Sequence, residues 1–181
     1  MEYLYTTIDG QTFMAGDGTV LVVGPFDMIT DRTLADVDAV KALTERIKTG
    51  AATEAQVQEY LNVLHKGAYT YRDMNRVEDA VQYVAQRMRT FSYLASLPAL
   101  RVWTVADKPS EADLNQYFNK VATLRNAITV MSSTPDAPNS AVGFDVTKAN
   151  ALEQILVDIE HILTRISLAW FYSGDLYAGE M

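Results

Sequence analysis

The chain has 181 residues, of which 49% are apolar and 21% charged, and its net charge is −8. This composition is typical of a folded protein with one domain or two small ones, and the negative charge argues against nucleic acid or an anionic membrane as a partner. The absence of cysteine excludes disulfides, thiolate metal sites and a cysteine nucleophile. No apolar run approaches the roughly 20 residues that a membrane span requires.

Residues 1–29 form a segment in which we expect short antiparallel strands. The runs EYLYTTI, QTFMA and TVLVV are rich in aromatic and β-branched residues, and turn signals that contain glycine separate them. A small hairpin sheet is only marginally stable alone. These strands must therefore pack on the rest of the chain or pair with another chain.

Five helices are predicted between residues 30 and 173, because a capping pattern occurs five times there. In each case a serine or threonine is followed three residues later by an acid or an amide, ahead of a run with helical apolar spacing. The cap residues are Thr33, Thr53, Thr70, Ser110 and Thr147. The first two begin short helices, at about 33–48 and 53–64, which we expect to cover one end of the bundle formed by the other three.

The other three helices are long, and each carries an apolar stripe. We expect the stripes to form the core of an antiparallel bundle; the alternative is a parallel oligomeric coiled coil, which would need more heptads. The apolar pattern allows the helix that begins at Thr70 to continue until Pro98. Ten stripe residues are expected to be buried together: Val77, Val81, Val84, Leu114, Phe118, Val121, Leu152, Ile155, Ile159 and Ile162.

The region after the fourth helix contains the clearest loop, and the chain ends much as it begins. Residues 129–144 carry two prolines, a glycine and three serines, which is typical of a loop. After the last helix, SGD would form a turn and LYA a last short strand, so residues 174–181 form a C-terminal strand or tail. The predicted fold class is therefore mainly α, with a bundle of three long and two short helices and a small antiparallel β element from the termini.

The sequence shows no recognisable catalytic or metal-binding pattern. His65 and His161 lie far apart along the chain, and Asp158 could share a helical face with His161, but a metal site needs at least one more ligand. No calcium loop, phosphate-binding loop or serine–histidine–acid arrangement is recognisable. We therefore expect no enzyme activity, no cofactor and no metal.

Aromatic residues near the two ends of the chain are the candidate interface. Large aromatic side chains provide contact area at low entropic cost, and an exposed strand edge can pair with another chain. The candidate interface residues are Tyr3, Tyr5, Trp170, Phe171, Tyr172 and Tyr177. Such residues could instead anchor the small sheet or contact a glycan.

Two further features leave alternatives open. Residues 1–31 contain five acids and no base, which gives either a solvated surface or a docking face for a basic partner. Asn75 and Asn115 each lie in the first turns of a predicted helix. They either face solvent or form hydrogen bonds to another helix or to a loop.

Most of the chain also resembles one group of proteins. The segments concerned read MITDRTLADVDAVKALTERIKTGAATEAQVQEYL, HKGAYTYRDMNRVEDAVQYVAQRM, WTVADKPSEADLNQYFNKVATLRNAI and AWFYSGDLYAGE. They are similar to segments of phage and prophage structural proteins of gut Firmicutes, over about residues 28–180. Thr70 stands where that pattern usually has Asn, and Met74 where it usually has Leu. The resemblance implies a virion component associated with a tail or fibre, and it implies no active-site residues.

Two functions are therefore expected from different classes. The first is a non-enzymatic structural or assembly protein of a phage or phage-like particle, assembled in the bacterial cytoplasm and located in the virion. Its partners would be other virion or tail proteins and further copies of itself, with no nucleic acid and no membrane. The second is a binding module for a cell-surface glycan or protein, which would use the aromatic turns. An enzyme is the remaining possibility.

Overall fold

The computed structural model of the chain describes residues 28–62 and 65–173, and within this part every regular element is a helix. The helices are α1 (Leu34–Lys48), α2 (Glu54–Asn62), α3 (Tyr71–Thr90), α4 (Glu111–Ala127) and α5 (Val146–Ser173). The prediction of a mainly α protein with five helices is confirmed. The predicted strands fall almost entirely on residues 1–27 and 174–181, which lie outside the described residues. No helix in the described part combines the length and the apolar character needed to cross a membrane.

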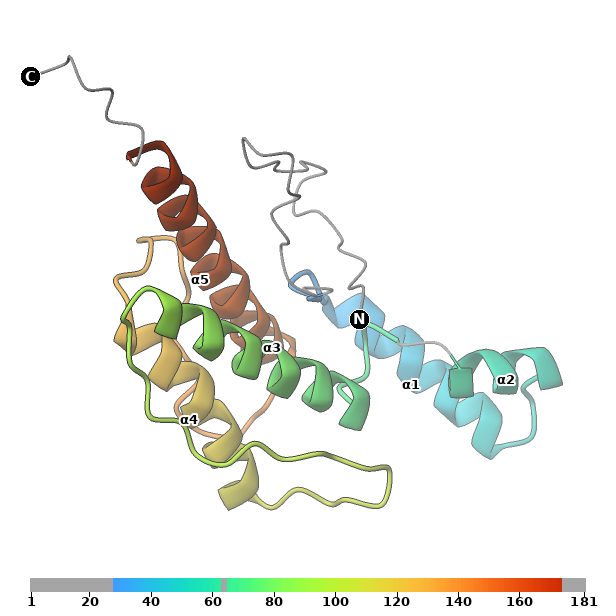
Figure 1. Cartoon of the computed structure of the whole chain (residues 1–181). Coiled ribbons are helices and arrows are strands. Elements are labelled where there is room, and N and C mark those ends of the chain that lie inside the picture. Colours follow the sequence, from blue (N-terminus) through green and yellow to red (C-terminus); the bar gives the residue numbers. More distant parts are fainter. Residues whose placement is uncertain (1–27, 63–64, 174–181) are drawn as a thin grey trace, which may run out of the picture.

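The hydrophobic core lies between α3, α4 and α5 (Figure 1). Of the ten stripe residues, all but Leu114 and Ile162 are buried, and those two are partly buried and pack against the core. Trp103 joins the core from the connector between α3 and α4, with 3% of its surface exposed. The apolar spacing of the three long helices therefore predicted the core correctly.

The three long helices run in the same general direction, so the prediction of an antiparallel bundle is wrong. Arg76 of α3 pairs with Glu153 of α5, and further along both helices Arg87 pairs with Glu160. In an antiparallel pair the second contact would move back along α5. Figure 1 shows α4 running the same way, from its lower end to its upper end.

Long connectors make this parallel arrangement possible. Residues 91–110 follow α3, and residues 128–145 follow α4. Each connector has about as many residues as the helix before it, and an extended chain covers roughly twice the length per residue of a helix. Each connector can therefore return along the whole bundle before the next helix starts, whereas antiparallel neighbours need only short loops.

The end of α3 lies earlier than the apolar pattern predicts. The helix stops at Thr90, and Ser92 adopts a left-handed conformation with φ of 66°. The N–H of Tyr93 donates to the carbonyl of Met88 at 2.9 Å, and the N–H of Ser92 donates to that of Arg89 at 3.0 Å. These two bonds satisfy the last carbonyls of the helix, so the chain turns off well before Pro98.

Four of the five predicted helix starts are confirmed, and the fifth is wrong by two residues. Thr33, Thr70 and Ser110 form reciprocal capping boxes, and Thr53 exchanges bonds with Gln56. In α5 the cap is Asp145, whose carboxylate accepts from the N–H of Lys148 at 2.9 Å. Aspartate caps a helix as well as serine or threonine does, so this helix begins before Thr147.

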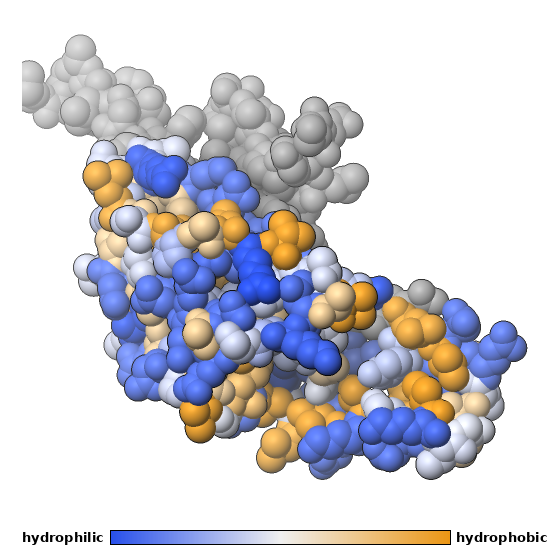
Figure 2. All heavy atoms as spheres, turned by 90° about the horizontal axis from the view of Figure 1, so that it is seen from below, coloured by the Kyte–Doolittle hydropathy of each residue, from blue (hydrophilic) through white to orange (hydrophobic). Residues whose placement is uncertain are grey.

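Helices α1 and α2 form an arm, defined here as residues 34–61, which extends to one side of the bundle (Figure 1). The prediction that these helices cover one end of the bundle is wrong, because α1 has no buried residue. The arm is held at its base, where a Cβ on Gly67 would lie 1.9 Å from the carbonyl oxygen of Asp36. Figure 2 shows apolar residues at the surface of the arm, at its right-hand end. Leu34 and Leu61 are among the exposed apolar residues of α1 and α2.

Candidate functional site

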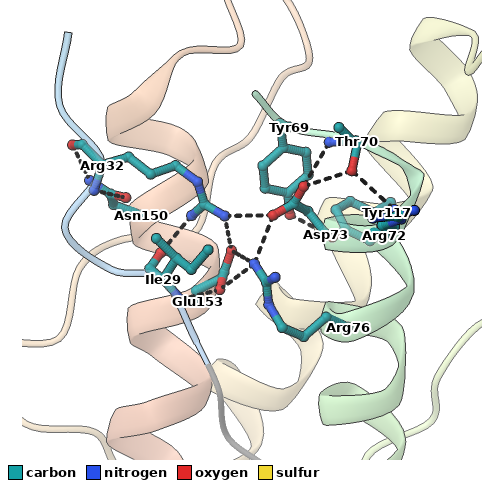
Figure 3. A network of polar contacts seen from close by, with 10 residues as sticks. All are labelled: Ile29, Arg32, Tyr69, Thr70, Arg72, Asp73, Arg76, Tyr117, Asn150 and Glu153. Carbon is teal, nitrogen blue, oxygen red and sulfur yellow. Dashed lines mark hydrogen bonds and ion pairs between the residues drawn. The ribbon is translucent and has the colours of Figure 1, made fainter. Parts of the chain in front are cut away.

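A buried network of two arginines and two carboxylates joins the start of the described chain to the bundle (Figure 3). Arg32 Nη2 lies 2.9 Å from Asp73 Oδ1 and 2.7 Å from Glu153 Oε1. Arg76 Nη2 donates to the same two oxygens, at 2.9 Å in each case. The side chains of Asp73 and Glu153 are fully buried, and two positive charges balance two negative ones.

The stem of the chain, residues 28–33, is fixed to α5 by main-chain bonds as well. The N–H of Ile29 donates to Glu153 Oε2 at 2.6 Å. The side-chain amide of Asn150 accepts from the N–H of Arg32 at 3.0 Å and donates to its carbonyl at 2.9 Å. The network therefore fastens the stem to α3 and α5 together.

Two tyrosines close the network on the side of α4. The hydroxyls of Tyr69 and Tyr117 lie 2.7 Å apart, and burial raises the pKa of both. The guanidinium carbon of Arg32 lies 5.2 Å from the centre of the Tyr69 ring, within the range of a cation–π contact. With its charges paired and its phenols held neutral, the network is suited to holding elements together.

Two more buried ion pairs connect the long helices. Lys120 Nζ of α4 donates to both carboxylate oxygens of Glu78 of α3, at 2.6 and 2.8 Å. Arg87 of α3 pairs with Glu160 of α5, which also accepts from the hydroxyl of Thr164 at 3.2 Å. Burial raises the pKa of the Glu160 carboxyl to about 7, despite the lowering effect of Arg87.

The connector after α3 contains a largely exposed segment, residues 99–105, which hydrogen bonds from α3 hold in place. The side-chain amide of Asn75 accepts from the N–H of Trp103 at 2.7 Å and donates to its carbonyl at 2.9 Å. Of the two alternatives for Asn75, the structure therefore shows the bond to a loop. Leu100, Val102 and Val105 point outward, with 40%, 82% and 84% of their surfaces exposed.

Arg101 and Asp107 complete the anchoring of this segment. The guanidinium of Arg101 lies 4.0 Å from the ring centre of Trp103 and pairs with Asp107 and Asp113, at 2.8 Å in each case. Bonds from the hydroxyl and N–H of Thr104, together with Arg101, lower the pKa of Asp107 to about 2. Asp107 is therefore ionised at neutral pH and able to hold Arg101.

A depression lined by side-chain amides lies beside α4. Its volume is about 590 Å³, and four carboxamides line it together with Pro98, Pro138 and two alanines. Those carboxamides belong to Asn115, Gln116, Asn119 and Asn139. Asn115 accepts from the N–H of Ala141 at 2.9 Å, so it too bonds to a loop. The lining carries no charged residue.

The side chains of the residues predicted as an interface all lie outside the described part of the structure. Tyr3, Tyr5 and Tyr177 lie outside the described residues. Residues 170–173, which include Trp170, Phe171 and Tyr172, belong to the last turn of α5, and their side chains lie outside the described part. The predicted interface stays a prediction.

Asp158 and His161, the pair considered for metal binding, both lie on α5, and no third ligand joins them in the described part of the chain. Asp158 accepts from the side-chain amide of Gln154 at 2.7 Å. Within residues 28–62 and 65–173, the structure contains no group of three or more acidic or histidine side chains that could hold a metal ion.

The buried network was not predicted from the sequence, although α5 contains a signal for it. Glu153 and Glu160 lie seven residues apart and each precedes a buried leucine, Leu156 or Leu163, by three residues. That spacing places both acids at the edge of the apolar stripe, where a charge needs a partner.

A scan against protein-family models, a search of curated proteins and a search of solved structures each found no match for the chain.

Proposed function

We propose that this chain is a non-enzymatic structural or assembly protein of a phage or phage-like particle, associated with its tail or fibre. It binds further copies of itself and other virion proteins, and it is assembled in the bacterial cytoplasm before it enters the particle. The assignment to a particle is supported by the sequence resemblance over residues 28–180. The assignment to assembly is supported by how the molecule distributes its charged and apolar residues.

The observation that carries this proposal is the contrast between core and surface. The buried carboxylates Asp73, Glu78 and Glu153 are engaged by arginine or lysine inside the bundle, which leaves them unsuited to act on a substrate. Large apolar side chains are exposed instead on the arm and on residues 94–105. Exposed apolar groups gathered on particular segments are typical of surfaces that bind proteins.

The experiment that tests the proposal is recovery of the chain from assembled particles. Particles released by the bacterium that carries the gene are purified on a density gradient and analysed by quantitative mass spectrometry. We expect the chain at a fixed ratio to the major tail protein through the whole gradient peak. A ratio that falls to zero in the peak, with the chain only in soluble fractions, would contradict a structural role.

A second candidate, a glycan-binding module, is favoured by the amide-lined depression. Carboxamides offer both donors and acceptors, which suits the neighbouring hydroxyls of a neutral sugar, and the depression has the size of ordinary ligand sites. Titration of purified protein with bacterial cell-wall oligosaccharides would test it. The double change Asn119→Ala and Asn139→Ala should then abolish binding, while Asn126→Ala, an exposed change on the same helix outside the lining, should leave it intact. Equal binding by all three proteins, or none by the unchanged chain, rules this candidate out.

A further inference from the structure

Both main-chain groups of Trp103, in the connector segment 99–103, are bonded to one side chain, the pattern that a residue of an extended chain makes with a neighbouring strand. In an extended chain the N–H and C=O of one residue point to the same side, and those of its neighbours point to the other side. Asn75 bonds both main-chain groups of Trp103, so it takes the place that a neighbouring strand would have. The N–H and C=O of Val102 therefore face away from Asn75, and no group in the described part of the chain bonds to them.

The free side of this edge lacks the charge that usually protects an exposed strand. Lysine or arginine side chains along an edge discourage pairing with other chains. Here the one basic residue, Arg101, is held back against Trp103 by Asp107 and Asp113. What remains outside is apolar, since Leu100 and Val102 are exposed.

A strand that needs such an edge is predicted in the same sequence. TVLVV, residues 19–23, has the strongest β pattern of the chain, and short strands require a partner to be stable. The residues that the structure describes form no strand with a free place for it. We propose that residues 19–23 of a second copy add as a strand to the edge at residues 99–103. This inference rests on the self-association contained in the proposed function.

The position of the stem indicates a second copy as the source. Arg32 holds the stem against Asp73, on the side of α3 that faces α5. Asn75 lies about 200° from Asp73 around the helix axis, because each residue of a helix turns by roughly 100°. Within one chain, the stem at residues 28–33 therefore lies on the far side of α3 from the edge. A neighbouring molecule can present its segment without passing around the bundle.

Cysteine trapping tests this proposal directly, because the natural chain contains no cysteine. One full-length variant carries Val102→Cys, and a set of five carries a single cysteine at each position from 19 to 23. The two kinds are mixed and oxidised gently, and a double variant with both cysteines is oxidised alone. We expect alternate positions of the set to form the mixed dimer in at least fivefold excess over either homodimer. A monomer with an internal disulfide in the double variant, a dominant 102–102 dimer, or no alternation along the set would each overturn the proposal.

A proline variant provides the matched test without cysteine. Val102→Pro removes the N–H that the added strand would use, whereas Val102→Thr keeps it. Position 102 lies in a connector outside the helices, so circular dichroism should show unchanged helix content. Light scattering should give at least tenfold weaker association for Val102→Pro and less than threefold for Val102→Thr. If the chain associates and both variants behave alike, strand addition is wrong while the proposed function stands; a chain absent from particles contradicts the proposed function itself.

Discussion

At the residue scale, the charged side chains of this protein fall into two groups with different energetic roles. Arg32 lies in the core with 2% of its side chain exposed and contacts two buried carboxylates. Lys48 pairs with Glu45 on the surface of α1, where both side chains are mostly exposed. Water screens the surface pair, whereas removing one member of a buried group leaves charges without partners.

We therefore expect Arg32→Met to destabilise the protein strongly. The change leaves Asp73 and Glu153 facing Arg76 alone, and such a loss typically lowers the free energy of unfolding by about 3–5 kcal/mol. The control, Lys48→Met, should change it by less than about 1 kcal/mol. Urea unfolding followed by circular dichroism measures both. Similar effects of the two changes would contradict the assigned role of the network.

The raised pKa of Glu160 makes the stability of the protein depend on pH. Its pKa of about 7 in the folded protein is higher than the ordinary value of 4.5, because burial disfavours the charged form. The folded state thus holds a proton that the unfolded state loses as the pH rises from about 4.5 to 7. This group's contribution to the free energy of unfolding falls over that window, by on the order of 3 kcal/mol, and is constant above it.

Comparison with Glu160→Gln isolates this effect. Thermal unfolding is measured from pH 4.5 to 8.5 for both proteins. The unchanged protein should lose more stability than the variant between pH 4.5 and 7, and the variant should be relatively more stable at pH 8. Parallel curves for the two proteins would show that Glu160 keeps an ordinary pKa.

The polar partners in the core are the part of the site that sequence could predict least. The sequence offered two possibilities for Asn75, because a polar residue in a first helical turn suits either solvent or a loop. Its partner, Trp103, lies 28 residues further on, and nothing in the local pattern indicates that distance. Arg32 and Glu153 are separated by most of the chain, so their pairing depends on the fold as a whole.

At the element scale, local signals determine where helices begin and end. The capping boxes at Thr33, Thr70 and Ser110 were predictable because each bond joins residues three apart. The start of α5 was predicted wrongly because two capping residues, Asp145 and Thr147, stand close together. Asp145 precedes Thr147 and caps the helix, so Thr147 is an ordinary exposed residue of the first turn.

This correction gives a paired prediction for α5. Asp145→Ala should lower the free energy of unfolding by about 0.5–2 kcal/mol, because the N–H of Lys148 loses its acceptor. Thr147→Ala should stay within about 0.5 kcal/mol of the unchanged protein, since surface changes away from a cap have small effects. Chemical denaturation of the two variants decides the matter. A larger loss for Thr147→Ala would restore the threonine as the cap.

At the scale of the whole molecule, apolar spacing predicted the class of fold, and all but two of the ten stripe residues are fully buried in the core. It did not predict the direction of the helices, because a stripe looks the same whether its neighbour runs parallel or antiparallel. The lengths of connectors 91–110 and 128–145 carry that information, and they fit the parallel arrangement that the ion pairs of Arg76 and Arg87 show. The arm was misplaced for a related reason: an apolar stripe on a short helix does not say which surface will cover it.

Under the proposed function, the exposed arm and the free edge are the surfaces through which copies of the chain associate. Leu61 on the arm and Val102 on the edge would both be covered if copies of the chain associate. The proposed function and the strand-addition model both require this association.

The mass of the full-length chain in solution shows whether copies associate. Light scattering coupled to gel filtration is performed over a hundredfold range of concentration at physiological salt. We expect a mass that is a multiple of the 20.1 kDa of one chain and that persists to low micromolar concentration. A mass of 20.1 kDa at every concentration would contradict this association.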